Sequence, residues 1–554
     1  MQANSYATAD YKVYTYFKDL LSYELLKSMG GGSVVNSIYY IVSEIYDTAQ
    51  YSLFVLLVFV FIGWYVKSKK WSIFSLYYIE NISRKISILY ASVVFVSFVI
   101  CGAFLNFPVY SHLNKIFVTK HLLSMMNILT DFDLDGYSMT TVPRDDYLFD
   151  STMHPYAIDF PDNGIDENSV GGDLVSIVRP QPFHFTKNEP VCNLVLVVCE
   201  SMRGDLHNKK FLNEYVLNNM RSVVGQDFQV LAHTAFTTPS VTSILSGTLS
   251  LDESAPSIFE ILKKNLNNIN VGVFSGQSEA FGGLESRNKM KLADVFFDSR
   301  SGGLKERMYL GTNDASLKMP GGVVAGSFKK WLDSVPNDKP FFSYVNLQEL
   351  HFPYNSEKID NKIIKNKISR NDISLKTKNE LEQTYLNAAR QLDEYLIDIV
   401  NSSRTKKSKY NTVVVIVGDH GEELYDHGIL GHGTKLSFEQ NSAYMKIVGM
   451  ERDLPMDYFY QKQLQRLIYS IIVGDLRAFG EYYRQSLKEN FIYVGNIKYP
   501  REVGKLIDGS IIKYDFYRKK YQKQSVFGED FTECEEAPDV VVPWESYMHA
   551  LKKL

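Results

Sequence analysis

From residue 191 onward, short apolar runs alternate with amphipathic stretches. The apolar runs are continuously hydrophobic, as is typical of central strands covered on both faces, and they occupy 193–199, 271–276, 340–347 and 411–418. The amphipathic stretches between them predict helices at 257–266, 322–334 and 380–400. Strands that alternate with helices predict an α/β domain in three layers, with a doubly wound, mostly parallel sheet in the middle.

Two longer apolar runs, at 51–66 and 86–107, carry no charged residue. We interpret both as transmembrane helices rather than as buried helices of a soluble core, although the first is slightly short for a complete span. The loop between them is rich in lysine and arginine, so the positive-inside rule places the loop in the cytoplasm and both flanks outside. An outward N-terminus without a signal peptide predicts that further spans precede residue 1.

Three regions follow from these patterns. Residues 1–107 are predicted to form a membrane region, and 191–554 an extracytoplasmic catalytic domain. The connector at 108–190 is expected to begin with an interfacial helix and to continue as an extended arm rich in Asp, Pro and Gly. Residues 455–554 predict a helix followed by β-hairpins, with edge strands rather than catalytic residues at YVGN (493–496) and KYPREVGKL (498–506).

Composition excludes some classes of protein. At 554 residues the chain exceeds the usual size of one core. Its net charge of −4 gives no reason to expect nucleic acid as a partner. The four cysteines form neither a CxxC metal knuckle nor an evident disulfide framework.

Three of the predicted strands end in side chains that bind metal ions. Glu200 follows the first strand, His351 follows the third, and Asp419 and His420 follow the fourth. The carboxyl ends of parallel strands meet at one edge of a sheet, so these side chains are expected to converge. Oxygen and imidazole donors without thiolate fit zinc, with manganese as the alternative, and the number of ions, one or two, stays open.

The segment AHTAFTTPSVTSILSG at 232–247 supplies candidate nucleophiles. Thr234 and Thr237 precede Pro239 at the start of a predicted helix, where backbone N–H groups favour anions. A threonine hydroxyl is a poor nucleophile unless a metal ion or a base lowers its pKa. The alternative is that these threonines only cap the helix.

Three motifs, ESMRGD at 200–205, TAFTTPSVTSILSG at 234–247 and GDHGEEL…HGILGHG at 418–433, together resemble the alkaline phosphatase/sulfatase superfamily. Within it, the likeness is closest to membrane-anchored phosphoethanolamine transferases and lipoteichoic acid synthase-like enzymes. The resemblance implies that Glu200, Asp419 and His420 hold a metal ion and that the nucleophilic threonine completes its ligand set.

The resemblance gives two alignments for the nucleophile. In the transferase spacing it stands five residues before the proline, at Thr234. In the sulfatase spacing it stands two residues before the proline and ten before a glycine, which matches Thr237 and Gly247. We favour Thr234, because the other matched motifs are of the transferase type.

Further residues match secondary positions of the family. His351 and His432 match histidines that bind a second metal ion or the phosphate group, with His427 as the alternative to His432. Arg203 and Lys435 are candidate phosphate contacts, with a surface charge or a salt bridge as the alternative role. The chain departs from the family in having no obvious cysteine pair in the soluble domain and no sulfatase CxPSR signature.

The resemblance implies a metal-dependent transferase. Its donor would be a membrane phospholipid, its cargo phosphoethanolamine or phosphoglycerol, its acceptor an envelope glycan or lipid, and its intermediate a phosphothreonine. It also implies a multi-pass protein of the bacterial inner (cytoplasmic) membrane with a periplasmic catalytic domain. Two alternatives are a hydrolase of phosphate or sulfate esters on surface polysaccharide and a non-enzymatic membrane protein that retains the fold.

Overall fold

The computed structural model describes residues 117–175, 183–186, 188–206, 210–211, 214–249, 255–266, 268–309, 317–356, 358–359 and 368–552. The two predicted transmembrane runs, 51–66 and 86–107, lie outside these residues. Among the residues that are described, no helix is both long and apolar enough to cross a bilayer.

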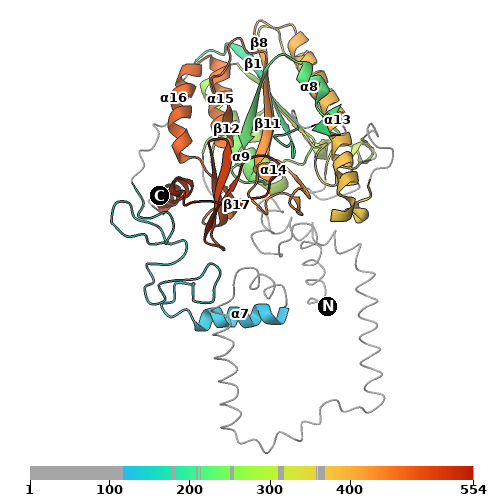
Figure 1. Ribbon diagram of the computed structural model, residues 1–554. Helices are drawn as coiled ribbons and strands as arrows, with labels where there is room; N and C mark the ends of the chain where they lie inside the picture. The colour runs from blue at the N-terminus through green and yellow to red at the C-terminus, as the bar shows by residue number, and fades with distance from the viewer. Residues whose placement is uncertain are drawn as a thin grey trace, which may run out of the picture.

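An eight-stranded sheet forms the centre of the catalytic region, with the strand order β12-β4-β11-β8-β1-β7-β5-β6 (Figure 1). The strands are β1 (Cys192–Cys199), β4 (Gln226–Leu231), β5 (Asn270–Ser275), β6 (Val295–Phe297), β7 (Phe341–Leu347), β8 (Asn411–Gly418), β11 (Ser442–Val448) and β12 (Tyr458–Tyr460). Only β11 runs antiparallel to its neighbours in this sheet. The predicted α/β class with a mostly parallel sheet is confirmed, and the four predicted strands correspond to β1, β5, β7 and β8.

Helices cover both faces of the sheet, with α15 and α16 on one side and α8 and α13 on the other (Figure 1). Alternate residues of β1 enter two different cores, because successive side chains of a strand point to opposite faces. Val195 and Val197 pack in one core with α12 and α13, whereas Leu194 and Leu196 pack in the other with α9, α10 and α15. The helices of these layers are α8 (Asn218–Ser222), α9 (Thr237–Ser246), α10 (Ile258–Asn265), α12 (Gly321–Ser334), α13 (Lys378–Thr405), α15 (Gln461–Val473) and α16 (Leu476–Ser486).

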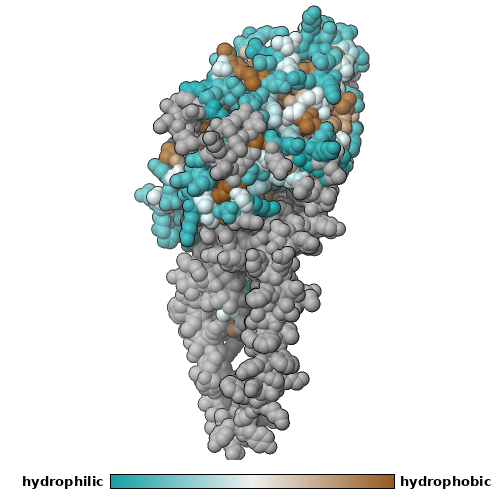
Figure 2. All heavy atoms as spheres, turned by 90° about the vertical axis from the view of Figure 1, so that its right-hand side faces the viewer, coloured by the Kyte–Doolittle hydropathy of each residue, from teal (hydrophilic) through white to brown (hydrophobic). Residues whose placement is uncertain are grey.

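The outer surface of the α8 and α13 side is mainly hydrophilic, with apolar side chains in small separate groups (Figure 2). The apolar sides of these helices are directed at the sheet, as three-layer packing requires. Shorter elements complete the described part of the chain: α7 (Phe117–Leu129), α11 (Leu284–Arg287), α14 (Phe438–Asn441), α17 (Val542–Lys552), β2 (Lys210–Phe211), β3 (Glu214–Tyr215), β9 (Glu423–Leu424) and β10 (Leu430–Gly431).

The C-terminal region forms a second, antiparallel sheet of five strands that follows α16. Its strands are β13 (Ile492–Asn496), β14 (Tyr499–Ile507), β15 (Ser510–Asp515), β16 (Lys520–Gln524) and β17 (Thr532–Glu533), in that spatial order. The predicted helix and hairpins are present. The prediction of edge strands holds for β13 but is wrong for β14, because β15 pairs with its second side.

The connector consists of α7 and an arm that packs on the C-terminal sheet. Residues 130–175, all of them described, contain no helix or strand. Tyr156 anchors the arm: its ring stacks on Phe516 at 4.7 Å between centroids, and its hydroxyl donates to the carbonyl of Pro500 at 2.8 Å. The helix α7 exposes Met125 and Ile128. An arm draped on the catalytic region agrees with the expectation, and the interfacial role of α7 stays a prediction.

Candidate active site

The register of the central sheet brings the first two candidate ligands together. Cys199 at the end of β1 lies beside Gly418 at the end of β8, so that the residues that follow, Glu200 and Asp419, are neighbours at the carboxyl edge. Together with His420 they each offer one ligand atom, and these atoms lie within 4.8 Å of one another. All three side chains are buried. Of the four residues from three strands that were expected to converge, Glu200, Asp419 and His420 form this cluster.

The hydrogen bonds of Asp419 and His420 each leave one side-chain atom free to bind a metal ion. Asp419 Oδ1 accepts from the backbone N–H groups of Ser201 and His420, each at 2.9 Å. His420 Nδ1 donates to the carbonyl of Gly421 at 2.8 Å. The remaining atoms, Asp419 Oδ2 and His420 Nε2, are buried and have no hydrogen-bond partner among the described residues. They lie 3.4 Å apart, and His420 Nε2 lies 3.5 Å from Glu200 Oε1.

The electrostatics of the cluster favour a cation. Burial opposes the charge of Glu200, but the positive side chains around it, led by His420 and Lys318, hold its pKa at about 2. Burial and the Glu200 charge raise the pKa of Asp419 to about 7. The ionisation of two adjacent buried carboxylates costs a large free energy unless a positive ion lies between them. Two carboxylates and one imidazole, with an open further position, fit zinc and also manganese.

Thr237, rather than Thr234, presents its hydroxyl to this cluster. It is the first residue of α9, it is half-buried, and its Oγ1 donates to Glu200 Oε1 at 2.9 Å. The helix ends at Gly247, which adopts the left-handed conformation with φ of 63°. Thr234 lies in the turn before the helix, where its carbonyl accepts from Ser240 Oγ at 2.7 Å. The geometry thus favours the sulfatase spacing, and our preference for Thr234 gives way to Thr237.

Two further histidines surround the cluster. His351 Nδ1 donates to the carbonyl of Phe352 at 2.7 Å, while burial and the charge of Lys318 lower its pKa to about 3. His432 Nδ1 lies 3.2 Å from a carboxylate oxygen of Glu422, and its ring centroid lies 4.2 Å from that of His420. In both rings the Nδ1 contact leaves Nε2 as the atom available to a ligand. The side chain of His432 is partly exposed, so the cluster can be approached from this side.

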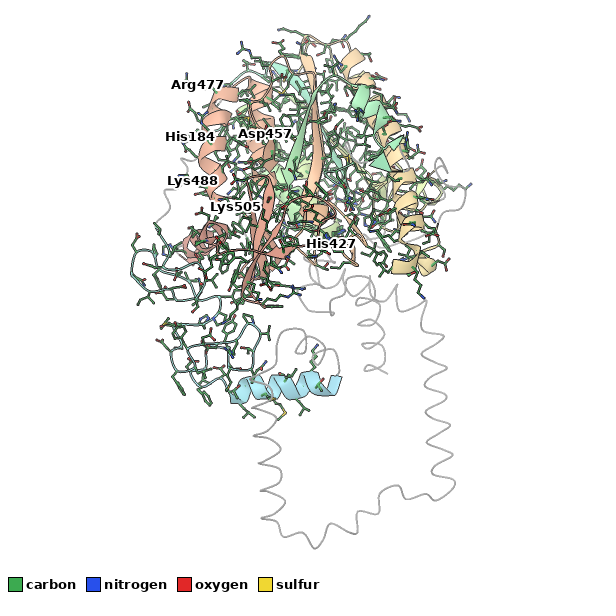
Figure 3. The ribbon with its side chains drawn as sticks, in the orientation of Figure 1. His184, His427, Asp457, Arg477, Lys488 and Lys505 are labelled. Carbon is green, nitrogen blue, oxygen red and sulfur yellow. The ribbon has the colours of Figure 1, made fainter. Side chains whose placement is uncertain are left out.

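Three candidates from the sequence have other contacts. The ring nitrogens of His427 lie 2.8 Å from Glu423 Oε1 and 2.9 Å from the carbonyl of Glu529. Its imidazole is therefore held at both ends near the loop that follows β8 (Figure 3). Lys435 Nζ lies 5.5 Å from the ring centroid of Phe531. His427 also forms a group with Glu423 and Glu439 that could itself hold a cation.

Arg203 is a buried ion-pair residue. Its guanidinium donates to Asp205 at 3.0 Å and to Asp426 at 2.7 Å, and its side chain is fully buried. The salt-bridge alternative for Arg203 is thus present, and its role as a phosphate contact stays a prediction. Because Asp426 belongs to the loop between β9 and β10, the ion pair fixes the segment that carries His427 and His432.

Lys318 is a site residue that the sequence did not indicate. It is buried, its Nζ lies 3.4 Å from Gln277 Oε1, and its charge contributes to the low pKa values of both Glu200 and His351. It lies just before α12 in a loop without a motif, and the bridge between Gln277 and Lys318 brings it to the carboxyl edge. Pairing between distant loops leaves no local pattern in the sequence.

The central part of the chain matches a known protein family. The sulfatase family model covers residues 192–444. A search of curated proteins finds no match. Similar solved structures include an alkaline phosphatase superfamily protein from Vibrio parahaemolyticus, with 15% identity over 72% of this chain and 92% of that chain and a TM-score of 0.46.

Two further structures show similarity at the same level. The lipoteichoic acid synthase LtaP from Listeria monocytogenes shares 15% identity over 67% of this chain and 92% of that chain, with a TM-score of 0.45. The periplasmic domain of the phosphoethanolamine transferase EptC from Campylobacter jejuni shares 18% identity over 55% and 94%, with a TM-score of 0.40. The family match contains β1, α9, β7 and β8, which carry the cluster. The match of the sulfatase family model to residues 192–444 thus agrees with the predicted resemblance to the alkaline phosphatase/sulfatase superfamily.

Proposed function

We propose that this chain is a metal-dependent transferase that moves a phosphoethanolamine or phosphoglycerol group from a membrane phospholipid to an envelope glycan or lipid. One observation carries the proposal: the half-buried Thr237 hydroxyl lies 2.9 Å from Glu200 Oε1, beside the unpartnered donor atoms of Asp419 and His420 in the described structure. A nucleophilic hydroxyl held against a cluster of ligands is the arrangement that phosphoryl transfer through a covalent intermediate requires.

Glu200, Asp419 and His420 would hold a zinc or manganese ion, with Thr237 adjacent. When bound, the ion supplies positive charge that favours loss of the hydroxyl proton and offsets the charge on the phosphoryl oxygens. Glu200 orients the Thr237 hydroxyl, and the N–H groups in the first turn of α9 favour the anionic phosphodiester.

In the first half-reaction, the Thr237 hydroxyl loses its proton to solvent water, from which it regains one at the end of the cycle, and the Thr237 Oγ–P bond forms as the bond from phosphorus to the diacylglycerol oxygen breaks. The leaving oxygen takes a proton from an imidazole. His351 is neutral at neutral pH, since its pKa is about 3. His432, whose Nδ1 is held by Glu422, is therefore the proposed acid. In the second half-reaction, an acceptor hydroxyl returns a proton to His432 and displaces Thr237 from phosphorus.

A lipid donor agrees with the apolar runs at 51–66 and 86–107, which would tether the site to the periplasmic face of the inner membrane. The match to the sulfatase family favours a second candidate, a hydrolase of phosphate or sulfate esters on surface polysaccharide. In that reaction water, rather than an acceptor hydroxyl, would release the group from Thr237.

Trapping the covalent intermediate tests the proposal. The full-length protein is incubated with head-group-labelled phosphatidylethanolamine or phosphatidylglycerol, and the tryptic peptide 222–263, which contains both threonines, is sequenced by mass spectrometry. We expect the labelled group on Thr237 with one of the two lipids. Thr237→Ala should lower turnover at least about 10³-fold, whereas Thr234→Ala should retain most of it.

The controls separate the two functions. Label on Thr234 with full activity of Thr237→Ala would reverse the choice of nucleophile. Release of free phosphoethanolamine or phosphoglycerol into water, with no transfer to any hydroxyl acceptor, would identify a hydrolase. Circular dichroism of both variants checks that the fold is retained.

A further inference from the structure

A second group of acidic residues lies far from the catalytic cluster, in the loop that follows α7. Asp131, Asp133 and Asp135 alternate with apolar residues and are followed by Gly136. Each offers a carboxylate oxygen, and these oxygens lie within 4.8 Å of one another. Side chains that belong to a five-residue stretch converge in this way only if the backbone turns sharply.

The backbone of the loop provides that turn. Leu134 and Gly136 adopt positive φ angles of 64° and 95°. Gly136 N–H donates to Asp131 Oδ2 at 3.0 Å, and Tyr137 N–H donates to Asp135 Oδ1 at 2.7 Å. These bonds orient two carboxylates and leave the others free: Asp131 Oδ1, both oxygens of Asp133 and Asp135 Oδ2 are buried atoms without a hydrogen-bond partner in the described chain.

Asp145 adds an independent observation. It comes from a later part of the arm, and its residue is 2% exposed. Tyr147 N–H donates to Asp145 Oδ1 at 2.8 Å, whereas Asp145 Oδ2 is buried and has no partner among the described residues. Asp145 N–H donates to the carbonyl of Ser138 at 3.0 Å, which holds this part of the arm beside the loop, and its carboxylate interacts electrostatically with Asp133 and Asp135. A buried carboxylate near other carboxylates is stabilised by a positive ion beside it.

Burial and the neighbouring carboxylates raise the pKa values of Asp135 and Asp145, and His154 opposes this shift only in part. The group contains oxygen donors and neither a thiolate nor an inward imidazole. Hard oxygen donors in a flexible loop are the ligands of Ca²⁺, whereas Mg²⁺ requires a nearly ideal octahedron and retains its waters.

We propose that Asp131, Asp133, Asp135 and Asp145 form a calcium site in the arm. The spacing of the first three and Gly136 follows the start of a calcium-binding loop of the D-x-D-x-D-G type. The twelfth position of such a loop is normally Glu, and here it is Val142. Asp145, three residues further on, takes the place of that missing ligand.

The site would join two parts of the molecule. Asp131 follows directly on α7, whereas Asp145 precedes Asp146, which forms an ion pair with Lys519 of the C-terminal sheet. A bound calcium ion would therefore fix α7 relative to the arm, which Tyr156 anchors to the same sheet (Figure 1). The inference does not depend on the proposed reaction.

Calorimetric titration of the full-length protein in detergent with CaCl₂ and, separately, MgCl₂ tests the site. All proteins carry Glu200→Gln, so that the catalytic cluster does not contribute. We expect the parent to bind one Ca²⁺ with a dissociation constant of about 10⁻³ M or tighter, in the range of extracellular modules, and in preference to Mg²⁺. Asp133→Asn combined with Asp135→Asn should weaken binding at least about tenfold. Asp150→Asn, an exposed aspartate that pairs with Thr152 in the same arm, should leave binding unchanged.

Thermal unfolding distinguishes loss of a ligand from loss of the fold. Without calcium, the Asp133→Asn, Asp135→Asn protein should be at least as stable as the parent, since the substitutions remove mutual repulsion. Calcium should raise the Tm of the parent and of Asp150→Asn only. Undiminished calcium binding by the double variant, absence of calcium binding by the parent at millimolar concentration, or preference for Mg²⁺ would each overturn the proposal.

Discussion

The catalytic cluster and the arm cluster present the same electrostatic problem and differ in how they are built. In each, buried carboxylates face one another and retain oxygen atoms without partners in the described structure. At the sheet edge, His420 joins Glu200 and Asp419, and the ligands come from positions more than two hundred residues apart. In the arm, three of four carboxylates come from one short loop, and all the donors are oxygen.

The ligand types and the rigidity of the two clusters indicate which metal ion each would bind. The sheet register fixes the catalytic donors rigidly, and an imidazole among them favours zinc or manganese. The arm loop is held by its own hydrogen bonds, and oxygen donors alone favour calcium. The two sites should therefore respond to different chelators and to different substitutions.

The largest expected effect is removal of the catalytic metal. His420→Ala deletes the imidazole whose Nε2 faces both carboxylates, and turnover should fall on the order of 10³-fold with loss of bound zinc or manganese. Metal analysis and the lipid-transfer assay measure both. Phenanthroline, whose nitrogen donors bind transition-metal ions and not calcium, should abolish turnover, whereas omission of calcium should leave most of it intact. Equal loss of turnover without calcium would mean that the two clusters are not chemically distinct.

Arg203→Met should have the next largest effect, and on stability. Its guanidinium neutralises Asp205 and Asp426 inside the protein, so its removal takes a fully buried cation away from both carboxylates. We expect a loss of about 3–5 kcal/mol, measured by thermal or urea unfolding. Arg477→Met is the matched control, because Arg477 on α16 is 92% exposed in its pair with Glu481 and should contribute less than about 1 kcal/mol (Figure 3). Similar losses in the two variants would refute the assignment of a structural role to Arg203.

The sequence predicts one half of the central sheet well and misses the other half. The strands β1, β5, β7 and β8 are buried on both faces, so they appear as unbroken apolar runs. The strands β4 and β11 carry Asp227 and Lys446, which neutralise each other at 3.0 Å across antiparallel partners. The ion pair can be recognised only in the folded structure. Because each strand contains a charged residue, neither β4 nor β11 appears in the sequence as a continuous hydrophobic run.

The same limit applies to the candidate site. Ligands at strand ends, such as Glu200 and Asp419, follow from the rule for parallel sheets. The choice between Thr234 and Thr237 does not, because both precede Pro239 in the sequence and only the structure shows that α9 begins at Thr237, whose hydroxyl reaches Glu200. Lys318 reaches the edge through a loop pairing that no sequence spacing encodes.

Glu545 is a buried carboxyl that belongs to neither cluster, so it can be compared with both. Its residue is 3% exposed, Oε1 accepts from Asn168 at 2.9 Å, and Oε2 has no hydrogen-bond partner in the described part of the chain. Burial raises its pKa to about 8, the Asn168 bond opposes the rise, and Asp159 and Asp166 add to it. Glu545 thus binds a proton, whereas the two clusters are proposed to bind a metal ion. Glu545→Gln, which mimics the protonated form, should stabilise the protein by about 1–3 kcal/mol near pH 7.

The pH dependence gives this prediction its control. The folded state holds the Glu545 proton more tightly than the unfolded state, whose pKa is near 4.5. The contribution of the group to stability is therefore complete below pH 4.5 and is lost as the pH rises through about 8. The advantage of Glu545→Gln should shrink toward zero in acid and grow toward pH 8, as measured by unfolding at several pH values. An advantage that does not change with pH would show that Glu545 is ionised in the folded state.

The smallest expected effect separates ligand geometry from general negative charge. Asp145 and Asp146 are neighbours, but Asp145 is buried with a free oxygen in the described structure, while Asp146 is exposed in ion pairs with Lys519 and Arg144. Asp145→Asn should weaken calcium binding at least about tenfold, because it removes a donor. Asp146→Asn removes the same formal charge a residue away, where solvent screens it, and should change the calcium dissociation constant by less than about twofold at 0.15 M salt. If both variants lost affinity equally, the arm would attract calcium through its net negative charge rather than through specific ligands. The arm and the catalytic cluster would then differ only in the density of their negative charge.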